Sequence, residues 1–276
     1  MFKNDLLRDK NIIITGGGTG LGKQMTKTFL EYGSSVSILS RNVDHLDAVK
    51  REMKGYGFDI KTEVCDIRNP DEIKKAVDDI EIDGKINVLI NNAAGNFISK
   101  TEDLTPKAFD TVLKIVLNGT SYFSLEMGKR WIESHINGVV LNIVATYAWT
   151  GSGYVVPSAI AKAGVLALTR SLAAEWGHYG IRSVAIAPGA FKTEGAWSKL
   201  LPDESYENAI KSRNPMRRLA TKEERANIAT FLISDMSSYI NGEVITVDGG
   251  DWLYGSSIFN MMENLPDDIW KIMRKR

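Results

Sequence analysis

Three side chains in one stretch of the sequence have types and spacings that suit acid–base and hydrogen-bond chemistry: Tyr147, Ser158 and Lys162. Ser158 and Lys162 stand four residues apart, so on a helix they share one face. Tyr147 comes just past an apolar, strand-like run, fifteen residues before Lys162. A tyrosine that projects from a strand end can meet that helix face. The spacing therefore predicts that a phenol, a hydroxyl and an ammonium group can converge, and such groups can take part in acid–base chemistry.

The first apolar run leads into a glycine-rich turn that suits a phosphate group. Residues 15–22 read TGGGTGLG, and a helix pattern follows them. Glycines let the backbone turn tightly and approach a pyrophosphate, and the helix N-terminus supplies free N–H groups. The strict spacing G-x-G-x-x-G fails here, whereas T-G-x-x-x-G-x-G fits with Gly16, Gly20 and Gly22. The turn predicts a dinucleotide cofactor.

The residues after the second apolar run indicate which dinucleotide is used. An acidic residue at this place binds the ribose 2′-hydroxyl of NAD, whereas a basic residue suits the 2′-phosphate of NADP. The sequence has Ser40, Arg41 and Asn42 here, and the nearest acid, Asp44, is expected to cap the next helix. Because Arg41 can pair with a phosphate, we predict NADPH rather than NADH. The alternative is that Arg41 is a solvated surface residue.

Seven short, β-branched apolar runs alternate with stretches of helical spacing. The runs are residues 11–15, 35–39, 60–65, 86–90, 138–144, 181–187 and 243–247. Runs without polar alternation suit strands covered on both faces, as in parallel sheets. The alternation predicts one α/β domain over residues 1–250, a Rossmann-type doubly wound parallel sheet with helices on both faces. Residues 251–276 are too apolar for a free tail, and we expect them to pack on the same domain or on a neighbouring subunit. A flap over a substrate site is the alternative.

Composition narrows the class of protein. The chain has 276 residues with 34 Lys+Arg and 34 Asp+Glu, a net charge of +0, which argues against a globally basic nucleic-acid binder. The single cysteine, Cys65, cannot form an internal disulfide, which favours a reducing, cytoplasmic location. No apolar run approaches the roughly 18 residues of a membrane helix. We therefore expect no membrane association, and no metal site either.

Polar residues or glycines come directly after most of the apolar runs. Ligands of open parallel sheets bind where the carboxyl ends of the strands meet, so these residues should share one site. Asp66, after the third run, can accept from an adenine amino group, and a helix cap is an equally open alternative. The small side chains in residues 91–95, NNAAG, let a flat ring pass close to the backbone. Pro188 and Gly189 follow the sixth run.

These motifs resemble the short-chain dehydrogenase/reductase superfamily. The resemblance covers nearly the whole chain, and DGG at residues 248–250 closes it. It implies a single dinucleotide-binding domain, a homotetramer, and an asparagine and a lysine of the site at Asn118 and Lys162. The positions that it implies for binding NADPH are Gly16, Thr19, Gly20, Leu21, Ser40, Arg41, Asp66, Ile67, Asn92, Ala93, Ala94, Lys162, Pro188, Gly189, Phe191 and Thr193.

The catalytic positions depart from the usual pattern of that superfamily. Its members carry a tyrosine four residues before the lysine and a serine about thirteen residues before that tyrosine. Here those two places hold Ser158 and Ala145. One explanation is that the chain is a degenerate, inactive relative. The other is that the functional hydroxyl is displaced to Tyr147. Tyr154, eight residues before Lys162, is a second candidate for that hydroxyl, and we rank it below Tyr147.

The displaced arrangement resembles one branch of the superfamily, the NADPH-dependent 2,4-dienoyl-CoA reductases. The similar stretches are NNAAGNFIS at 91–99, VLNG at 116–119, TGSGYVVPSA at 150–159 and AAEWG at 173–177. This resemblance implies that Tyr147 and Asn96 bind the thioester carbonyl oxygen. It also implies that Lys162 and Ser158 hold the nicotinamide ribose. The alternative for Asn96 is a turn residue that bonds to the local backbone.

The chemistry of a dienoyl thioester accounts for the change of residues. Reducing a ketone places the hydride on the carbonyl carbon, so the oxygen needs a proton from a nearby acid. Reducing a conjugated dienoyl thioester places the hydride on the δ-carbon, and negative charge moves to the thioester oxygen. That oxygen needs two oriented donors, an oxyanion hole, which Tyr147 and Asn96 can supply. The resemblance thus implies reduction of a 2,4-dienoyl-CoA in unsaturated fatty acid oxidation.

A coenzyme A substrate brings phosphates and a pantetheine arm. The resemblance implies that Arg68 and Lys199 contact the CoA phosphates and that Phe97 and Thr105 line the substrate. Surface lysines and arginines are common, so each basic residue has a solvated alternative. Two other functions stay open: a reductase of another acyl thioester (3-oxoacyl or enoyl) or of a free carbonyl, and a catalytically silent scaffold that binds NADPH or CoA.

Overall fold

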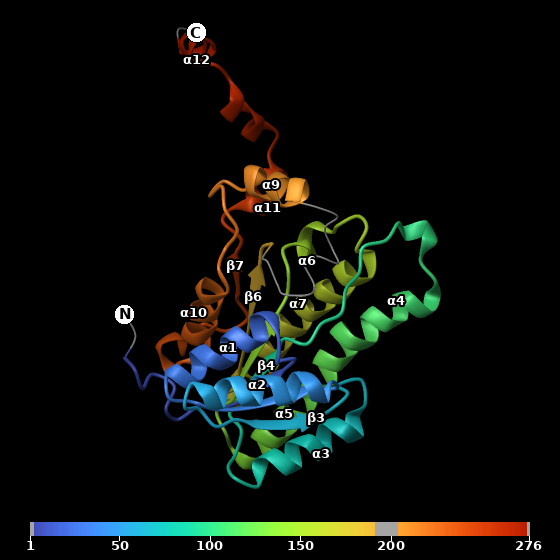
Figure 1. Ribbon diagram of the computed structural model, residues 1–276, viewed down its shortest axis with the longest axis vertical. Helices are drawn as coiled ribbons and strands as arrows, with labels where there is room; N and C mark the ends of the chain where they lie inside the picture. Colours follow the sequence, from blue (N-terminus) through green and yellow to red (C-terminus); the bar gives the residue numbers. More distant parts are fainter. Residues whose placement is uncertain (1–2, 191–203, 275–276) are drawn as a thin grey trace.

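The computed structural model describes residues 3–190 and 204–274, and its centre is a sheet of seven parallel strands in the order β3-β2-β1-β4-β5-β6-β7 (Figure 1). The strands are β1 (Asn11–Thr15), β2 (Ser35–Ser40), β3 (Lys61–Val64), β4 (Val88–Asn91), β5 (Val139–Ile143), β6 (Arg182–Pro188) and β7 (Val244–Val247). Each falls on one of the seven apolar runs, and the predicted doubly wound α/β fold is confirmed. The strand order reverses direction between β1 and β4, the place where such sheets bind ligands.

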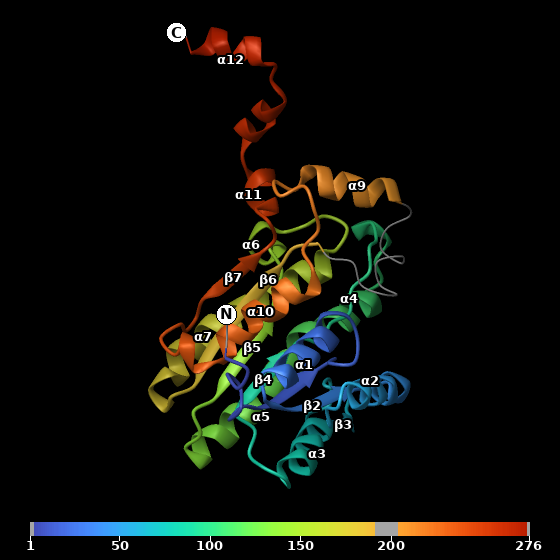
Figure 2. The same cartoon turned by 60° about the vertical axis from the view of Figure 1, so that its left-hand side comes forward.

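Helices cover both faces of this sheet (Figures 1 and 2). The helices are α1 (Gly20–Glu31), α2 (Val43–Gly55), α3 (Pro70–Glu81), α4 (Pro106–Leu113), α5 (Gly119–Ser134), α6 (Tyr147–Thr150), α7 (Val156–Trp176), α9 (Glu204–Arg213), α10 (Lys222–Ile233), α11 (Asp251–Ser256) and α12 (Asp267–Met273). Apolar residues of α1, α2 and α10 pack on one face of the sheet. Those of α3, α5 and α7 pack on the other. A π-helical turn at Lys114–Asn118 joins α4 to α5.

The helix starts show where sequence reasoning about caps was right or wrong. Asn42, not Asp44, caps α2, because its side chain accepts from the N–H of His45 while Asp44 lies in the first turn. Likewise Asn69 caps α3, so the cap alternative for Asp66 is wrong. Asparagine at an N-cap satisfies one of the free N–H groups without adding charge. Both acids, Asp44 and Asp66, are thereby left for other contacts.

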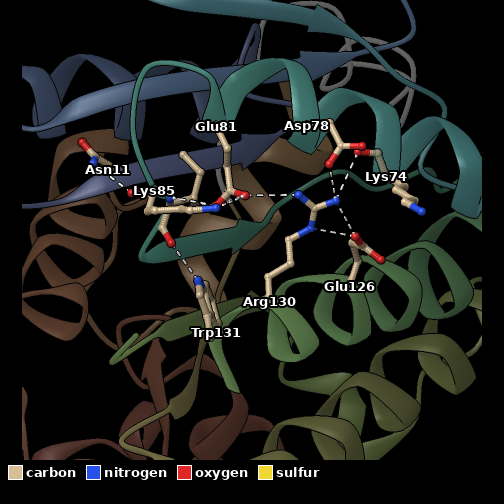
Figure 3. Close-up of polar contacts among 9 residues, drawn as sticks. Asn11, Lys74, Asp78, Glu81, Lys85, Glu126, Arg130 and Trp131 are labelled. Carbon is tan, nitrogen blue, oxygen red and sulfur yellow. Dashed lines mark hydrogen bonds and ion pairs between the residues drawn. The ribbon is translucent and has the colours of Figure 1, made fainter. Parts of the chain in front are cut away.

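Polar contacts join α3 to α5 near the amino ends of the strands (Figure 3). Arg130 of α5 donates to Asp78 and Glu81 of α3 and to Glu126 one turn earlier, at 2.7–3.1 Å. Next to it, the Trp131 indole N–H donates to the carbonyl of Ile86 at 2.7 Å, just before β4. The Glu81 side chain is only 7% exposed, so its charge needs this partner. The contacts hold two helices of one layer together, on the side away from the strands' carboxyl ends.

After α11 the chain leaves the body of the protein in both views (Figures 1 and 2). We call residues 257–274 the C-terminal arm; it contains a 3₁₀ segment, Ile258–Asn264, and α12. Its large apolar side chains are exposed, with Ile258 at 76% and Phe259 at 71%. In the described residues, no helix is both long and apolar enough to cross a membrane.

Candidate active site

One cavity of about 1210 Å³ opens at the carboxyl ends of the strands. It is larger than the ~300–1000 Å³ of ordinary small-molecule pockets, as a dinucleotide and a second substrate together would require. The predicted cofactor residues that line it are Gly16, Thr19, Gly20, Leu21, Ser40, Arg41, Asp66, Ile67, Asn92, Ala93, Ala94, Lys162, Pro188 and Gly189. Every predicted cofactor position in the described residues therefore reaches the same cavity. Phe191 and Thr193, and the predicted substrate residue Lys199, lie outside the described residues.

The glycine turn has the geometry of an anion cradle. Gly16 and Gly20 have φ of +66° and +54°, which a residue with a side chain rarely adopts. A Cβ on Gly22 would lie 2.4 Å from the carbonyl oxygen of Gly16, so the helix can begin this close to the turn only with glycine. Thr19, the N-cap of α1, makes no side-chain capping bond, and the first turn holds no acid. The first N–H groups of α1 are thus suited to bind the pyrophosphate of a dinucleotide.

A hydrogen-bonded clamp joins this turn to the end of β4. The Thr15 hydroxyl accepts from the N–H of Asn92 at 3.1 Å and of Ala93 at 3.0 Å. In return the Asn92 amide donates to the carbonyls of Thr15 and Gly16 at 3.1 and 3.0 Å. Two strand ends are therefore fixed to each other by side chains. The clamp sets the width of the cavity between the phosphate turn and residues 92–94.

Arg41, Asp66 and Arg68 gather beside the ends of β2 and β3. Arg68 pairs with both carboxylate oxygens of Asp66, with Nε at 2.9 Å from Oδ1, and Arg41 lies 3.8 Å from Oδ2. The hydrogen bond from Arg68 holds the pKa of Asp66 below its usual range. Arg41 and Asp66 line the cavity. The Arg41 side chain is 53% exposed, so a phosphate can reach its guanidinium.

At the other end of the cavity, Tyr147 and Ser158 meet as the sequence predicts. Tyr147 begins α6, directly after β5, and its phenol oxygen lies 3.0 Å from the Ser158 hydroxyl on α7. Ser158 is buried, and burial raises the pKa of Tyr147 even though the bond to Ser158 opposes the shift. The phenol therefore stays protonated at neutral pH. A protonated phenol can donate a hydrogen bond to a substrate oxygen.

Lys162 lies one helical turn after Ser158 and is almost fully buried. Its side chain donates to the carbonyl of Ile143 at the end of β5. Burial lowers its pKa from 10.5 to about 8. The bond to Ile143 fixes the ammonium group at the cavity wall, because Ile143 and Lys162 both line the cavity. Tyr147 and Lys162 are thus held by the same strand end and the same helix.

A chain of hydrogen bonds between buried polar side chains lies in the interior and joins the strands to the helix that carries Lys162. The Asn91 amide donates to Asn142 at 2.9 Å and to Ser124 at 3.0 Å, and the Asn142 amide donates to Thr169 at 2.9 Å. These bonds connect β4, β5, α5 and α7 in the interior. Because each buried polar group has a partner, the chain fixes α7, and with it Lys162, relative to the sheet. The apolar pattern of the runs did not reveal this role for Asn142 and Thr169.

Asn96 is exposed and lines the cavity. Its side-chain oxygen accepts from the N–H of Phe97 at 2.9 Å, which is the local backbone contact that the alternative of a turn residue predicts. The bond uses the amide oxygen and leaves the amide N–H groups as donors, which is what an oxyanion needs. Phe97 and Thr105 do not line the cavity; Thr105 caps α4. Their contact with substrate stays a prediction, as does that of Arg68.

Tyr154 lies apart from the cavity, in the loop before α7. Its side chain is 64% exposed, and it is one of the few non-glycine residues with positive φ, +64°. Its carbonyl accepts from the N–H of Ser99 at 2.9 Å and so joins the loop after β4 to the loop after α6. This placement supports ranking Tyr154 below Tyr147 as the functional hydroxyl.

The sequence did not predict the contribution of α9, and α11 belongs to residues 251–276, for which a flap over a substrate site was only the alternative. Ile210 and Arg213 of α9, together with Asp251 and Trp252 of α11, line the cavity. Arg213 pairs with Asp251 at 2.8 Å, and the Trp252 ring packs edge-on against Trp149 of α6 at 5.7 Å. α11 therefore forms part of the cavity wall near Tyr147. The only sequence signal was the end of the strand–helix alternation at Gly250.

Burial of Lys162 predicts a pH dependence of stability. Between its pKa of about 8 in the folded protein and 10.5, the unfolded chain binds a proton that the folded chain does not. The contribution of Lys162 to the free energy of unfolding should therefore rise with pH in this window, by about 1 kcal/mol per pH unit. We expect denaturant titrations of the cofactor-free protein to show the wild type gaining stability relative to Lys162→Met from about pH 8 to about pH 10. A stability difference between the two that stays flat or falls with pH would contradict this.

Comparisons with known proteins show which family the chain resembles. A family model described as Enoyl-(Acyl carrier protein) reductase matches residues 16–251. A Bacillus subtilis protein named a probable 2,4-dienoyl-CoA reductase, (2E)-enoyl-CoA-producing, is 46% identical over 90% of this chain and 98% of its own length. A Caenorhabditis elegans protein named probable 2,4-dienoyl-CoA reductase 3, (3E)-enoyl-CoA-producing, is 40% identical over 98% of this chain and 90% of its own.

Solved structures show the same fold. A short chain dehydrogenase from Bacillus anthracis has a TM-score of 0.82 at 44% identity and covers 89% of this chain and 97% of its own. A gluconate 5-dehydrogenase from Burkholderia cenocepacia, solved with NADP and tartrate, has a TM-score of 0.84 at 26% identity over 92% of this chain and 99% of its own. From the family match, the relatives and the shared parallel sheet, the chain belongs to the short-chain dehydrogenase/reductase family.

Proposed function

We propose that this protein reduces 2,4-dienoyl-CoA thioesters to enoyl-CoA with NADPH, in the oxidation of unsaturated fatty acids. The observation that carries the proposal is the hydroxyl pair of Tyr147 and Ser158, 3.0 Å apart, on the cavity that Lys162 and Asn96 also line. Relatives of similar length that are named 2,4-dienoyl-CoA reductases support it.

When bound, NADPH would supply a hydride to the δ-carbon, and a proton from solvent at the α- or γ-carbon of the resulting dienolate would complete the enoyl-CoA. Meanwhile the protein's own residues hold the negative charge that develops on the thioester oxygen. The Tyr147 phenol and the Asn96 amide N–H donate to the thioester oxygen. Ser158 orients the phenol, and the raised pKa of Tyr147 keeps its proton in place, which suits a fixed donor better than an acid that must give its proton away. Lys162, fixed by the carbonyl of Ile143, holds the ribose next to the nicotinamide.

Arg41 is the proposed partner of the 2′-phosphate. It is exposed at the cavity, and the end of β2 offers no acid to bind a ribose hydroxyl. In the present structure Arg41 and Arg68 both face Asp66, so a phosphate would compete with that carboxylate for them. Arg68 and Lys199 are the proposed contacts for the CoA phosphates, and Phe97 and Thr105 for the rest of the substrate.

The proposal is tested by NADPH oxidation with a 2,4-dienoyl-CoA, a 2-enoyl-CoA and a 3-oxoacyl-CoA side by side. We expect turnover of the dienoyl-CoA alone. Turnover of only the 3-oxoacyl-CoA would support an ordinary carbonyl reductase, and no turnover of any would support a silent binding protein. Identifying the product's double bond then separates the (2E) and (3E) products that the relatives' names specify.

Replacing the phenol tests the role of Tyr147. Because Tyr147→Phe removes one of two oxyanion donors and leaves the cavity's shape intact, kcat should fall about 10²–10³-fold while NADPH affinity changes little. Tyr154→Phe is the matched control, with a hydroxyl on an exposed ring outside the cavity, and should keep full activity. Full activity of Tyr147→Phe would rule out the proposed donor.

Replacing the guanidinium tests the coenzyme assignment. Arg41→Ala should weaken NADPH binding about ten- to a hundredfold, as expected for losing a hydrogen bond to a charged group, and leave NADH binding nearly unchanged. Arg51→Ala, an exposed arginine on α2 that does not line the cavity, is the control and should affect neither. Equal losses for both coenzymes would defeat the 2′-phosphate assignment.

We also propose a cytoplasmic homotetramer in which the C-terminal arm packs on a neighbouring subunit. The free, buried thiol of Cys65 supports the location. The exposed Ile258, Phe259, Ile272 and Met273 of the arm support the packing, because such residues are expected to be covered. Ending the chain after Ser256 should lower the number of subunits in the assembly, measured as its mass in light scattering divided by the mass of the shortened chain, while NADPH still binds. An unchanged number of subunits would contradict the packing.

A further inference from the structure

Arg225, in the first turn of α10, is fully buried. Arginine is almost never fully buried in a protein unless it is paired. Here Nη1 donates to the carbonyls of Ala220 and Thr221 at 3.0 and 2.9 Å. Nη2 donates to the carbonyls of Gly189 and Ala190 at 3.3 and 3.0 Å. The guanidinium thus joins the start of α10 to the backbone that follows β6.

The two carbonyls of that backbone belong to the cavity wall. Pro188, Gly189 and Ala190 all line the cavity, whereas Arg225 does not. Arg225 therefore reaches this segment from behind, on the side away from a ligand. A planar guanidinium can donate to two adjacent peptide carbonyls at once. The path of the backbone at 189–190 is set by this contact.

On its other side the segment is held by the end of β7. The N–H of Gly189 donates to the carbonyl of Val247 at 3.0 Å. A Cβ on Gly189 would lie 2.7 Å from the Cβ of Asp248, so there is no free space between them. The segment cannot move toward β7, where Asp248 blocks it, and a movement away from β7 would break the hydrogen bond between Gly189 and Val247.

The helix that carries Arg225, α10, is held in place at its start and along its length. Thr221 and Glu224 form a capping box at the start of α10, and Arg218 pairs with Glu224 at 2.6 Å. Farther along, Ala226, Ala229, Leu232 and Ile233 are buried in the core beside the sheet. The helix is therefore a fixed reference from which one side chain positions the cavity wall.

We propose that Arg225 is a positioning residue for the end of the cofactor cavity that holds Tyr147 and Lys162. It acts through the carbonyls of Gly189 and Ala190, which it holds so that residues 188–190 form a wall for the nicotinamide half of the coenzyme. This rests on the proposed function only in placing the nicotinamide beside Tyr147 and Lys162. The adenosine half, at Arg41 and Asp66 on the other side of the cavity, should not depend on Arg225.

The chain offers a matched control. Arg182, at the start of β6, donates through Nη1 to the carbonyl of Ile240 at 3.1 Å and through Nη2 to those of Leu232 and Ser234 at 3.0 and 3.3 Å. It ties backbone carbonyls at the amino end of β6, whereas Arg225 ties them at the carboxyl end. Arg182 does not line the cavity. Replacing either arginine removes a similar set of contacts, but only one set adjoins the cavity.

The test compares Arg225→Met with Arg182→Met in binding and in turnover. For Arg225→Met we expect NADPH to bind about tenfold more weakly, with unchanged binding of 2′-phospho-ADP-ribose, which lacks the nicotinamide. We expect kcat to fall about ten- to a hundredfold, because a small misplacement remote from the chemistry has effects of this size. In hydrogen exchange of the cofactor-free protein, the N–H of Gly189 should lose protection. Arg182→Met should lose stability but keep all of these properties.

Arg225→Lys separates the effect of the hydrogen bonds from the effect of side-chain volume. A lysine ammonium can donate to one of the two carbonyls, so this variant should recover part of the NADPH affinity that Arg225→Met loses. If Arg225→Met does not fold, Arg225→Lys and Arg225→Gln carry the same measurements. Equal weakening of NADPH and 2′-phospho-ADP-ribose, or identical behaviour of the Arg225 and Arg182 variants, would overturn the proposal. The binding arms use no acyl substrate, so they stand even if the dienoyl-CoA assay fails. If the coenzyme is NADH, the same pair is NADH and ADP-ribose.

Discussion

All seven strands run in the same direction, and the position of every functional group depends on this. Parallel neighbours need crossover connections, so each strand delivers the residues after its carboxyl end to the same edge of the sheet. Gly16, Asp66, Asn92, Tyr147 and Gly189 come from five different strand ends and line one cavity. The clamp between the ends of β1 and β4 makes that edge rigid, and the contacts of Arg130 fasten α3 to α5 near the opposite edge.

Positive charge is used in two different ways along this edge. Lys162 and Arg225 are buried, and their side chains donate to backbone carbonyls, which fixes them and the segments that they touch. Arg41 and Arg68 lie nearer the solvent and share the carboxylate of Asp66, a contact that an incoming phosphate can replace. A buried cation is costly to move, whereas an exposed ion pair is weak and exchangeable. The net charge of +0 is a sum that contains both kinds.

The sequence was most informative where a backbone conformation admits only one type of residue. The seven apolar runs became the seven strands, and the glycines at 16, 20 and 22 lie where positive φ or a close approach excludes a side chain. It was less informative about which polar group serves which partner. Asp44 and Asp66 have the chemistry of helix caps, but Asn42 and Asn69 take those places because the helices begin earlier or later than the acids.

Local pattern alone determined the fold, the phosphate turn and the meeting of Tyr147 with the Ser158–Lys162 face. The phosphate turn and the meeting of the side chains depend on neighbours within one strand–helix unit, and the fold depends on the repetition of that unit along the chain. Only the tertiary structure showed that α11 lines the cavity near Tyr147 and that Arg225 donates to the carbonyls of residues 189 and 190. Those contacts join segments far apart in the chain. An exposed arginine and a buried one look the same in a sequence until packing decides which carbonyls surround it.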